Sequence, residues 1–113
     1  MNDRQTREAA GFEAALGRWQ QGIAAGDLEM VASAFTADAL FKGLHPEHSI
    51  GREGVKEYYG SQEPGLTVEY RVLHLREISP GSAVTFLEAD FHTGRGELVR
   101  THITTVLCDS DAG

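Results

Sequence analysis

The side chains best suited to chemistry are few, and most of them are histidines. His45 and His48 flank Glu47, a spacing that superficially suggests a pair of metal ligands. Residues 44–50 contain Pro46 and are expected to form a loop, and no third or fourth ligand is evident near it. We therefore expect no metal site here. The loop is interpreted as the mouth of a pocket, where His45 contacts the ligand.

Three other reactive side chains offer only weak signals. His74 is a weak candidate for a general base, because histidine titrates near neutral pH, but a histidine that merely hydrogen-bonds a neighbour is the simpler alternative. Cys108 has no basic neighbour close in the sequence to activate it as a nucleophile. Arg52 could bind an anion near a helix start, or it could pair with nearby glutamates. The catalytic residues are therefore unknown, and so is whether the protein is an enzyme.

Length and charge exclude several classes of protein. The chain has 113 residues, with 10 Lys and Arg against 17 Asp and Glu, which gives a formal net charge of −7. Residues 1–113 are expected to form one domain. The acidic balance argues against nucleic acid and an anionic membrane as partners. No apolar run reaches the ~18–20 residues that span a bilayer, and a cytoplasmic location is the expectation.

The first part of the chain has helical periodicity. A long first helix is predicted to end at Gly26, and Asp27 is predicted to cap the next helix. The inward face of the first helix is predicted to carry residues at spacings of four, three and four, namely Phe12, Leu16, Trp19 and Ile23. The second helix is expected to carry Leu28, Val31 and Phe35 on one side.

A short strand at 39–43 and a third helix are predicted next. The helix begins at Ser49 or Gly51 and runs to about Tyr59, with Val55 and either Tyr58 or Tyr59 facing inward. Residues 66–78, 83–93 and 97–108 are rich in β-branched and aromatic residues and are predicted to be strands. Helices followed by an antiparallel meander indicate an α+β fold.

The loop at residues 94–96 fixes the register between the strands predicted at 83–93 and 97–108. A three-residue loop with Gly96 in the left-handed conformation sets Thr93 opposite Glu97. The apolar face then pairs Leu87 with Ile103 and Phe91 with Val99. The opposite face carries a ladder of charges, namely Arg71, Glu88, Asp90, Arg100 and His102.

The other hairpin is predicted to have a four-residue loop at 79–82. This places Tyr70 beside Phe91 and turns His74 inward beside Leu87. An apolar patch remains on the outer face of the sheet, formed by Leu73, Leu75, Phe86 and Val106. A homodimer through this face is the expected cover, and a loop or tail of the same chain is the alternative.

Several stretches resemble the nuclear-transport-factor-2-like superfamily. They are Trp19, residues 25–28 (AGDL), 34–41 (AFTADALF) and 51–55 (GREGV), and Tyr58-Tyr59. Residues 41–46 (FKGLHP) and 59–64 (YGSQEP) are similar to the SgcJ/EcaC type in particular, close to the SnoaL-like proteins. The resemblance implies a cystatin-like cone in which three N-terminal helices pack on a curved antiparallel sheet around an apolar pocket. It also implies dimers through the outer sheet face.

The sequence departs from the ketosteroid-isomerase-like members of that superfamily. The position of their helix tyrosine holds Trp19, and the position of their base holds Gly43. Their second aspartate falls near Ile103 or His102, and neither is a carboxylic acid. Because proton transfer needs a base and a polarised donor, we reject steroid-isomerase chemistry. Relatives also continue into one more strand, so the resemblance implies that the final strand is missing here unless the chain continues past Gly113.

The resulting hypothesis is a pocket that binds a hydrophobic, polyketide-like metabolite. The protein would be an accessory enzyme or ligand-binding protein of secondary metabolism, and a non-catalytic dimeric protein-interaction domain is the alternative. No cofactor is expected, because no dinucleotide, haem or flavin signature is present. The expected ligand-binding residues are Trp19, Phe35, Phe41, His45, Tyr58, Tyr70, Phe91, Thr101, Ile103 and Thr105.

Overall fold

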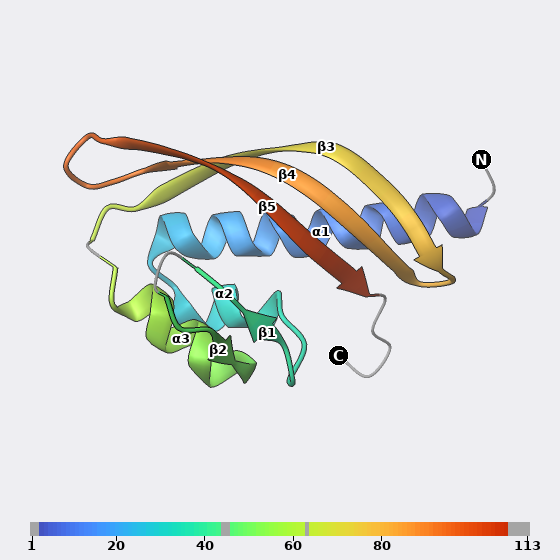
Figure 1. Cartoon of the computed structure of the whole chain (residues 1–113), viewed down its shortest axis with the longest axis horizontal. Helices are drawn as coiled ribbons and strands as arrows, with labels where there is room; N and C mark the ends of the chain where they lie inside the picture. Colours follow the sequence, from blue (N-terminus) through green and yellow to red (C-terminus); the bar gives the residue numbers. More distant parts are fainter. Residues whose placement is uncertain (1–2, 44–45, 63, 109–113) are drawn as a thin grey trace.

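Helices α1 (Asp3–Ala25), α2 (Leu28–Ser33) and α3 (Gly51–Gly60) pack on an antiparallel sheet, as Figure 1 shows. The sheet has the order β3 (Thr67–Ser79), β4 (Ser82–His92) and β5 (Leu98–Cys108). A small second sheet pairs β1 (Leu40–Phe41) with β2 (Ser49–Ile50). This computed structural model describes residues 3–43, 46–62 and 64–108. The predicted α+β architecture of three helices on an antiparallel sheet is confirmed.

The predicted stripe of α1 is its buried face. Phe12, Leu16, Trp19 and Ile23 are each only 5–7% exposed. Gly26 has a φ of +67° and closes the helix, because its amide and that of Asp27 donate to carbonyls of the last turn. The Asp27 carboxylate then accepts a 3.1 Å hydrogen bond from the Met30 amide and caps α2. Both predicted caps are confirmed.

The two following helices differ in detail from the prediction. α2 ends at Ser33, so Phe35 lies beyond the helix rather than on it. Residues 49–50, predicted as loop and helix start, form β2 instead and pair with β1. In α3 the buried tyrosine is Tyr59, four residues after the buried Val55, whereas Tyr58 is half-buried. Of the two tyrosines that the sequence left open, Tyr59 is therefore the one that faces inward.

The register between β4 and β5 is as predicted. Leu87 lies opposite Ile103, Phe91 opposite Val99, and Glu88 opposite His102. The amide of Thr93 donates to the carbonyl of Glu97 across the loop at 2.9 Å, and Gly96 has a φ of +85°. The local turn geometry was sufficient to determine this hairpin.

The register between β3 and β4 differs because β3 is irregular at two places. Ser79 lies opposite Ser82, as a four-residue loop requires, but irregularities follow between Glu77 and Ser79 and between Val72 and His74. Each shifts the pairing by one residue, so Tyr70 lies opposite Ala89 rather than Phe91. Two shifts restore the original faces, so Tyr70 and Val72 still lie on the helix side of the sheet.

Between the two irregularities the faces are exchanged. His74 lies opposite Phe86 on the outer face, and Leu75 lies opposite the buried Thr85 on the helix side. The prediction that His74 points inward is therefore wrong, and so is the assignment of Leu75 to the outer patch. A single-residue shift reverses every side chain until the next one, which is the physical reason for both errors.

The interior lies between α1 and the sheet and extends to α2 and α3. Val31, Val55, Leu87 and Thr85 have essentially no exposed surface. In Figure 1, α1 runs beneath the curved sheet, with α3 and the small β1–β2 sheet beside it. Among the described residues, no helix has both the length and the apolar character needed to cross a bilayer.

Candidate functional site

A hydrogen bond between two buried aromatic side chains joins the helices at the centre of the interior. Trp19 of α1 donates its indole N–H to the hydroxyl of Tyr59 of α3 at 2.9 Å. The indole ring also contacts Tyr70 of β3 and Phe91 of β4, with ring centroids 6.1 and 6.0 Å away. Trp19 therefore links a helix to two of the three strands of the main sheet, β3 and β4.

A second group of rings continues from Tyr59. The ring of Phe41 lies 5.6 Å from that of Tyr59, 5.0 Å from that of Tyr58 and 5.6 Å from that of Phe35. The Arg52 guanidinium holds this end in place, because its Nε donates to the carbonyl oxygen of Phe35 at 2.9 Å. Six of the predicted ligand-binding residues thus join one aromatic cluster through Tyr59, namely Trp19, Phe35, Phe41, Tyr58, Tyr70 and Phe91.

The electrostatic surroundings of the cluster are apolar. Burial raises the pKa of the Tyr59 phenol well above its ordinary value, although the hydrogen bond from Trp19 opposes this shift. Burial also raises the pKa of Tyr70, with a smaller contribution from the charge of Glu13. Both phenols are therefore neutral at physiological pH and can serve only as neutral hydrogen-bonding groups.

The inner face of β5 is partly uncovered. Thr101, Ile103 and Thr105 lie on the helix side of the sheet, yet each is half-buried rather than sealed. The hydroxyl of Thr101 donates to the carbonyl of Ala89 at 3.0 Å, and that of Thr105 is hydrogen-bonded to the hydroxyl of Thr85. Since these hydroxyls bond within the sheet, the surface they present is mainly apolar.

The remaining predicted residues lie elsewhere or outside the described part. His45 falls outside the described residues, and its neighbour His48 is exposed. His74 lies on the outer face, where its ring packs edge-on against Phe86 at 6.2 Å. Cys108 is exposed and free. Within residues 3–43, 46–62 and 64–108, no three His, Cys, Asp or Glu side chains converge as metal ligands would.

Gly43, where the resemblance placed the isomerase base, has no room for a side chain. A side chain built at Gly43 would overlap the phenol ring of Tyr58. An acid at this position would therefore require Tyr58 to move, which is consistent with the absence of a carboxylate there. Tyr59 was one of the two tyrosines expected to face inward but was not among the predicted ligand-binding residues; its spacing of four residues after Val55 favoured it over Tyr58.

The outer face carries the predicted ladder of charges. Arg100 forms a two-pronged pair with Asp90, with N···O distances of 2.8 and 3.1 Å. This hydrogen bonding lowers the pKa of Asp90. Glu88 pairs with Arg71 and lies 3.4 Å from the imidazole Nε2 of His102. The ladder joins all three strands and points away from the helices.

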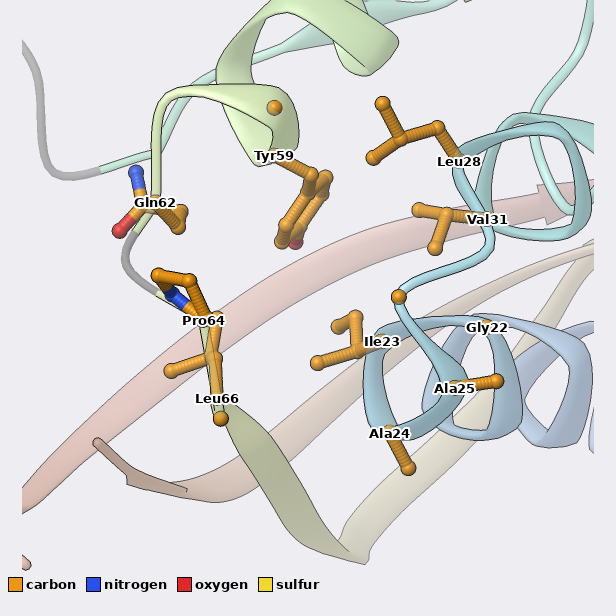
Figure 2. Close-up of a pocket in the computed structure, with 13 residues that line it drawn as sticks. Gly22, Ile23, Ala24, Ala25, Leu28, Val31, Tyr59, Gln62, Pro64 and Leu66 are labelled. Atoms are coloured by element: carbon orange, nitrogen blue, oxygen red, sulfur yellow. The ribbon is translucent and has the colours of Figure 1, made fainter. Parts of the chain in front are cut away.

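A cavity of about 450 Å³ lies away from the predicted pocket, where the ends of α1 and α3 meet the start of β3. Figure 2 shows side chains of Ile23, Val31, Tyr59 and Leu66 around it. None of the ten predicted ligand-binding residues lines this cavity; its walls are Gly22, Ile23, Ala24, Ala25, Gly26, Leu28, Val31, Tyr59, Gly60, Gln62, Pro64, Gly65 and Leu66. The one signal in the sequence was the cluster of small residues at these helix ends.

Comparisons with known proteins bear on the fold. No protein-family model matches the chain, and no curated protein does. A solved structure of a domain of unknown function from Nostoc punctiforme, described as having a cystatin-like fold, superposes with a TM-score of 0.82 at 18% identity. This match covers 96% of this chain and 72% of the other.

Two further solved structures have related names. A ketosteroid isomerase-like protein from Erwinia carotovora atroseptica matches at a TM-score of 0.74 and 18% identity, over 100% of this chain and 89% of that one. A Δ5-3-ketosteroid isomerase from a Mycobacterium species matches at 0.68 and 14% identity, over 90% and 85%. Together with the packing of three helices on an antiparallel sheet, these likenesses show that the chain has the cystatin-like fold.

Proposed function

We propose that the protein binds a hydrophobic, polyketide-like small molecule between the inner face of β5 and the aromatic cluster. It would act as an accessory enzyme or ligand-binding protein of secondary metabolism, in the manner of the SgcJ/EcaC type of nuclear-transport-factor-2-like proteins. The single SnoaL-like domain at 1–113 is part of this proposal.

One observation carries the proposal. Thr101, Ile103 and Thr105 face the helices and are still half-buried, although inner-face residues of β4 such as Leu87 and Ala89 are fully covered. Apolar surface that faces inward and remains accessible is typical of a ligand site rather than of a core. The names of two structural neighbours are ketosteroid isomerase-like protein and Δ5-3-ketosteroid isomerase, which supports a small cyclic ligand.

The ring geometry favours a ligand with extended apolar faces. Phe41, Tyr58, Tyr70 and Phe91 are half-buried aromatic rings that contact their neighbours in the cluster. The two phenols whose pKa values are raised, Tyr59 and Tyr70, add hydrogen-bonding groups without charge. A neutral, largely apolar ring system matches this surface better than a charged metabolite does.

The proposal is tested by thermal unfolding with a panel of aromatic polyketides and cyclic ketones. A ligand present at a hundred times its Kd should stabilise the protein by about 2.7 kcal/mol and raise the melting temperature. The variant Ile103→Trp should abolish the shift, because the larger side chain fills the inner face of β5. Leu98→Trp is the matched control, since Leu98 is exposed on the outer face of the same strand.

Two results would contradict the proposal. The melting temperature could stay constant across the whole panel, or a ligand-induced shift could persist undiminished in Ile103→Trp while that variant is folded. The first result would favour the non-catalytic interaction domain, which responds only to its protein partner.

We further propose that the protein is a homodimer through its outer sheet face. Leu73, Phe86 and Val106 are 46%, 47% and 64% exposed, and the ring of His74 packs against Phe86 in the place predicted for Leu75. Large apolar side chains gathered on one sheet face are usually covered by a partner. A second copy is the partner that supplies a matching apolar surface.

A further inference from the structure

The cavity at the ends of α1 and α3 is distinct from the proposed interior site. The Tyr59 ring forms one wall of it, and the Tyr59 hydroxyl accepts the Trp19 hydrogen bond, so this tyrosine separates the two spaces. A volume of about 450 Å³ lies within the range of small-molecule sites, roughly 300–1,000 Å³. Binding in this cavity does not require the function proposed for the interior.

The walls of the cavity are uncharged. The described residues that line it comprise aliphatic side chains, glycines and alanines, with Gln62 and Tyr59 as the polar members. Burial raises the pKa of Tyr59, so its phenol remains neutral. A charged group that entered would lose water without gaining a partner of opposite charge from these residues. The walls therefore favour a neutral ligand.

Backbone carbonyls at two helix ends provide hydrogen-bond acceptors at the cavity, beside the polar side chains of Gln62 and Tyr59. α1 ends at Ala25 and α3 ends at Gly60, so two carbonyl-bearing helix ends meet at the cavity. The Asp27 amide donates to the carbonyl of Gly22, and the Gly26 amide donates to that of Ile23. The carbonyls of Ala24 and Ala25 have no residue of α1 four positions ahead whose amide could donate to them. The C-terminal ends of α1 and α3 favour a hydrogen-bond donor over an anion, and the only helix start among the described lining residues is Leu28 of the six-residue α2.

The glycines fix the shape of the cavity. A Cβ atom at Gly22 would come within 2.7 Å of the Val31 amide nitrogen and Cγ2, so α1 and α2 cross in close backbone contact here. By contrast, a Cβ atom at Gly60 would lie 3.4 Å from the Leu28 side chain, which is an ordinary contact. Gly60 is thus a position where the cavity can be filled from a helix end.

From these features we propose that the cavity is a second ligand site. It takes an uncharged, largely apolar small molecule that carries one hydroxyl or N–H group. The apolar body lies against Ile23, Val31 and Leu66, and the donor points to the carbonyl ends of α1 and α3.

Adamantan-1-ol is a suitable probe, with adamantane-1-carboxylate and adamantan-1-ammonium as charged counterparts of the same shape. In ¹⁵N-resolved NMR titrations of the unmodified protein, the alcohol should shift the amides of Gly22, Gly26, Gly60 and Gly65 saturably. The amides of Thr101 and Ile103 in the interior should move little. The carboxylate should bind at least tenfold more weakly than the alcohol.

The variant Gly60→Leu should weaken binding of the alcohol at least tenfold, whereas Ile103→Trp should leave it unchanged. Three results would overturn the proposal: shifts that centre on Thr101 and Ile103, equal binding of the carboxylate or tighter binding of the ammonium, or no saturable shift at the solubility limit. If Gly60→Leu does not fold, the amide shifts and the comparison of the three probes on the unmodified protein still test the proposal. Loss of ligand binding at β5 would contradict only the function proposed for the interior.

Discussion

The contact between Trp19 and Tyr59 is the central feature at the scale of single residues. It joins α1 to α3, and the two side chains are 7% and 9% exposed. A buried donor without an acceptor is costly, so each side chain stabilises the position of the other. Neither residue is close to the other in sequence, and only the fold brings them together.

Replacing Tyr59 with phenylalanine should lower the free energy of unfolding by about 1–3 kcal/mol, because the indole N–H loses its acceptor in the interior. Urea titration followed by circular dichroism measures the change. Tyr70→Phe is the control, since no hydrogen bond of the Tyr70 hydroxyl is found among the described residues. That variant should change stability by less than about 0.5 kcal/mol. Equal losses in the two variants would contradict the role given to the Trp19–Tyr59 bond.

The same side chain predicts an alkaline dependence. Burial raises the pKa of Tyr59 above its ordinary value of 10.0, so the folded state holds the phenol neutral where the unfolded chain ionises. This contribution to stability is present in full below pH 10 and is lost as the pH rises toward the folded pKa. The melting temperature of the unmodified protein should therefore fall more steeply above pH 10 than that of Tyr59→Phe. Parallel curves for the two proteins would refute this dependence.

At the scale of secondary-structure elements, two features shape the molecule. The irregularities in β3 exchange the faces of His74 and Leu75, and the close crossing of α1 and α2 requires a glycine at Gly22. Elsewhere in α1, glycine has no such role: a Cβ atom at Gly17 or Gly11 would meet nothing within 4 Å. Within α1, therefore, a side chain is sterically excluded at Gly22 but tolerated at Gly11 and Gly17.

Alanine substitutions in α1 test this difference. Gly17→Ala should stabilise the protein by about 1 kcal/mol, because alanine has the higher helix propensity. Gly22→Ala should destabilise it by about 1–3 kcal/mol, because its Cβ would overlap the backbone and side chain of Val31. Chemical denaturation of the two variants provides the comparison. Stabilisation by Gly22→Ala would show that α1 and α2 can separate at little cost.

At the scale of the whole molecule, the sheet has two different faces. The inner face meets the helices, and the outer face carries ion pairs at one end and exposed apolar side chains at the other. In Figure 1 the helices lie on a single side of the sheet, so the other side is open in the isolated chain. The proposed homodimer follows from this asymmetry.

Light scattering after size-exclusion chromatography tests the dimer. The unmodified protein should have about twice the mass of the 12.3 kDa chain, and Phe86→Glu should reduce it to one chain, because a carboxylate would be buried in an apolar interface. Leu40→Glu is the matched control, since Leu40 is 79% exposed on β1 and should not affect assembly. A single-chain mass for the unmodified protein at high concentration would rule out the dimer.

The sequence by itself determined the features that depend on neighbouring residues. The stripe of α1, the Gly26 and Asp27 caps, the three strands and the β4–β5 register could all be predicted, because periodicity, capping and a tight turn act over a few residues. Six aromatic residues of the cluster were expected on the inner face, and their role as ligand contacts stays a prediction.

Only the tertiary structure decided the rest. The irregularities in β3, the hydrogen bond between Trp19 and Tyr59, and the cavity at the helix ends all depend on contacts between distant segments. Strand registry shifts where a strand must adapt to its neighbours, and a cavity exists where separate helix ends fail to fill a common space. Neither property is encoded in a window of adjacent residues, so His74 was misplaced and the walls of the cavity were not foreseen.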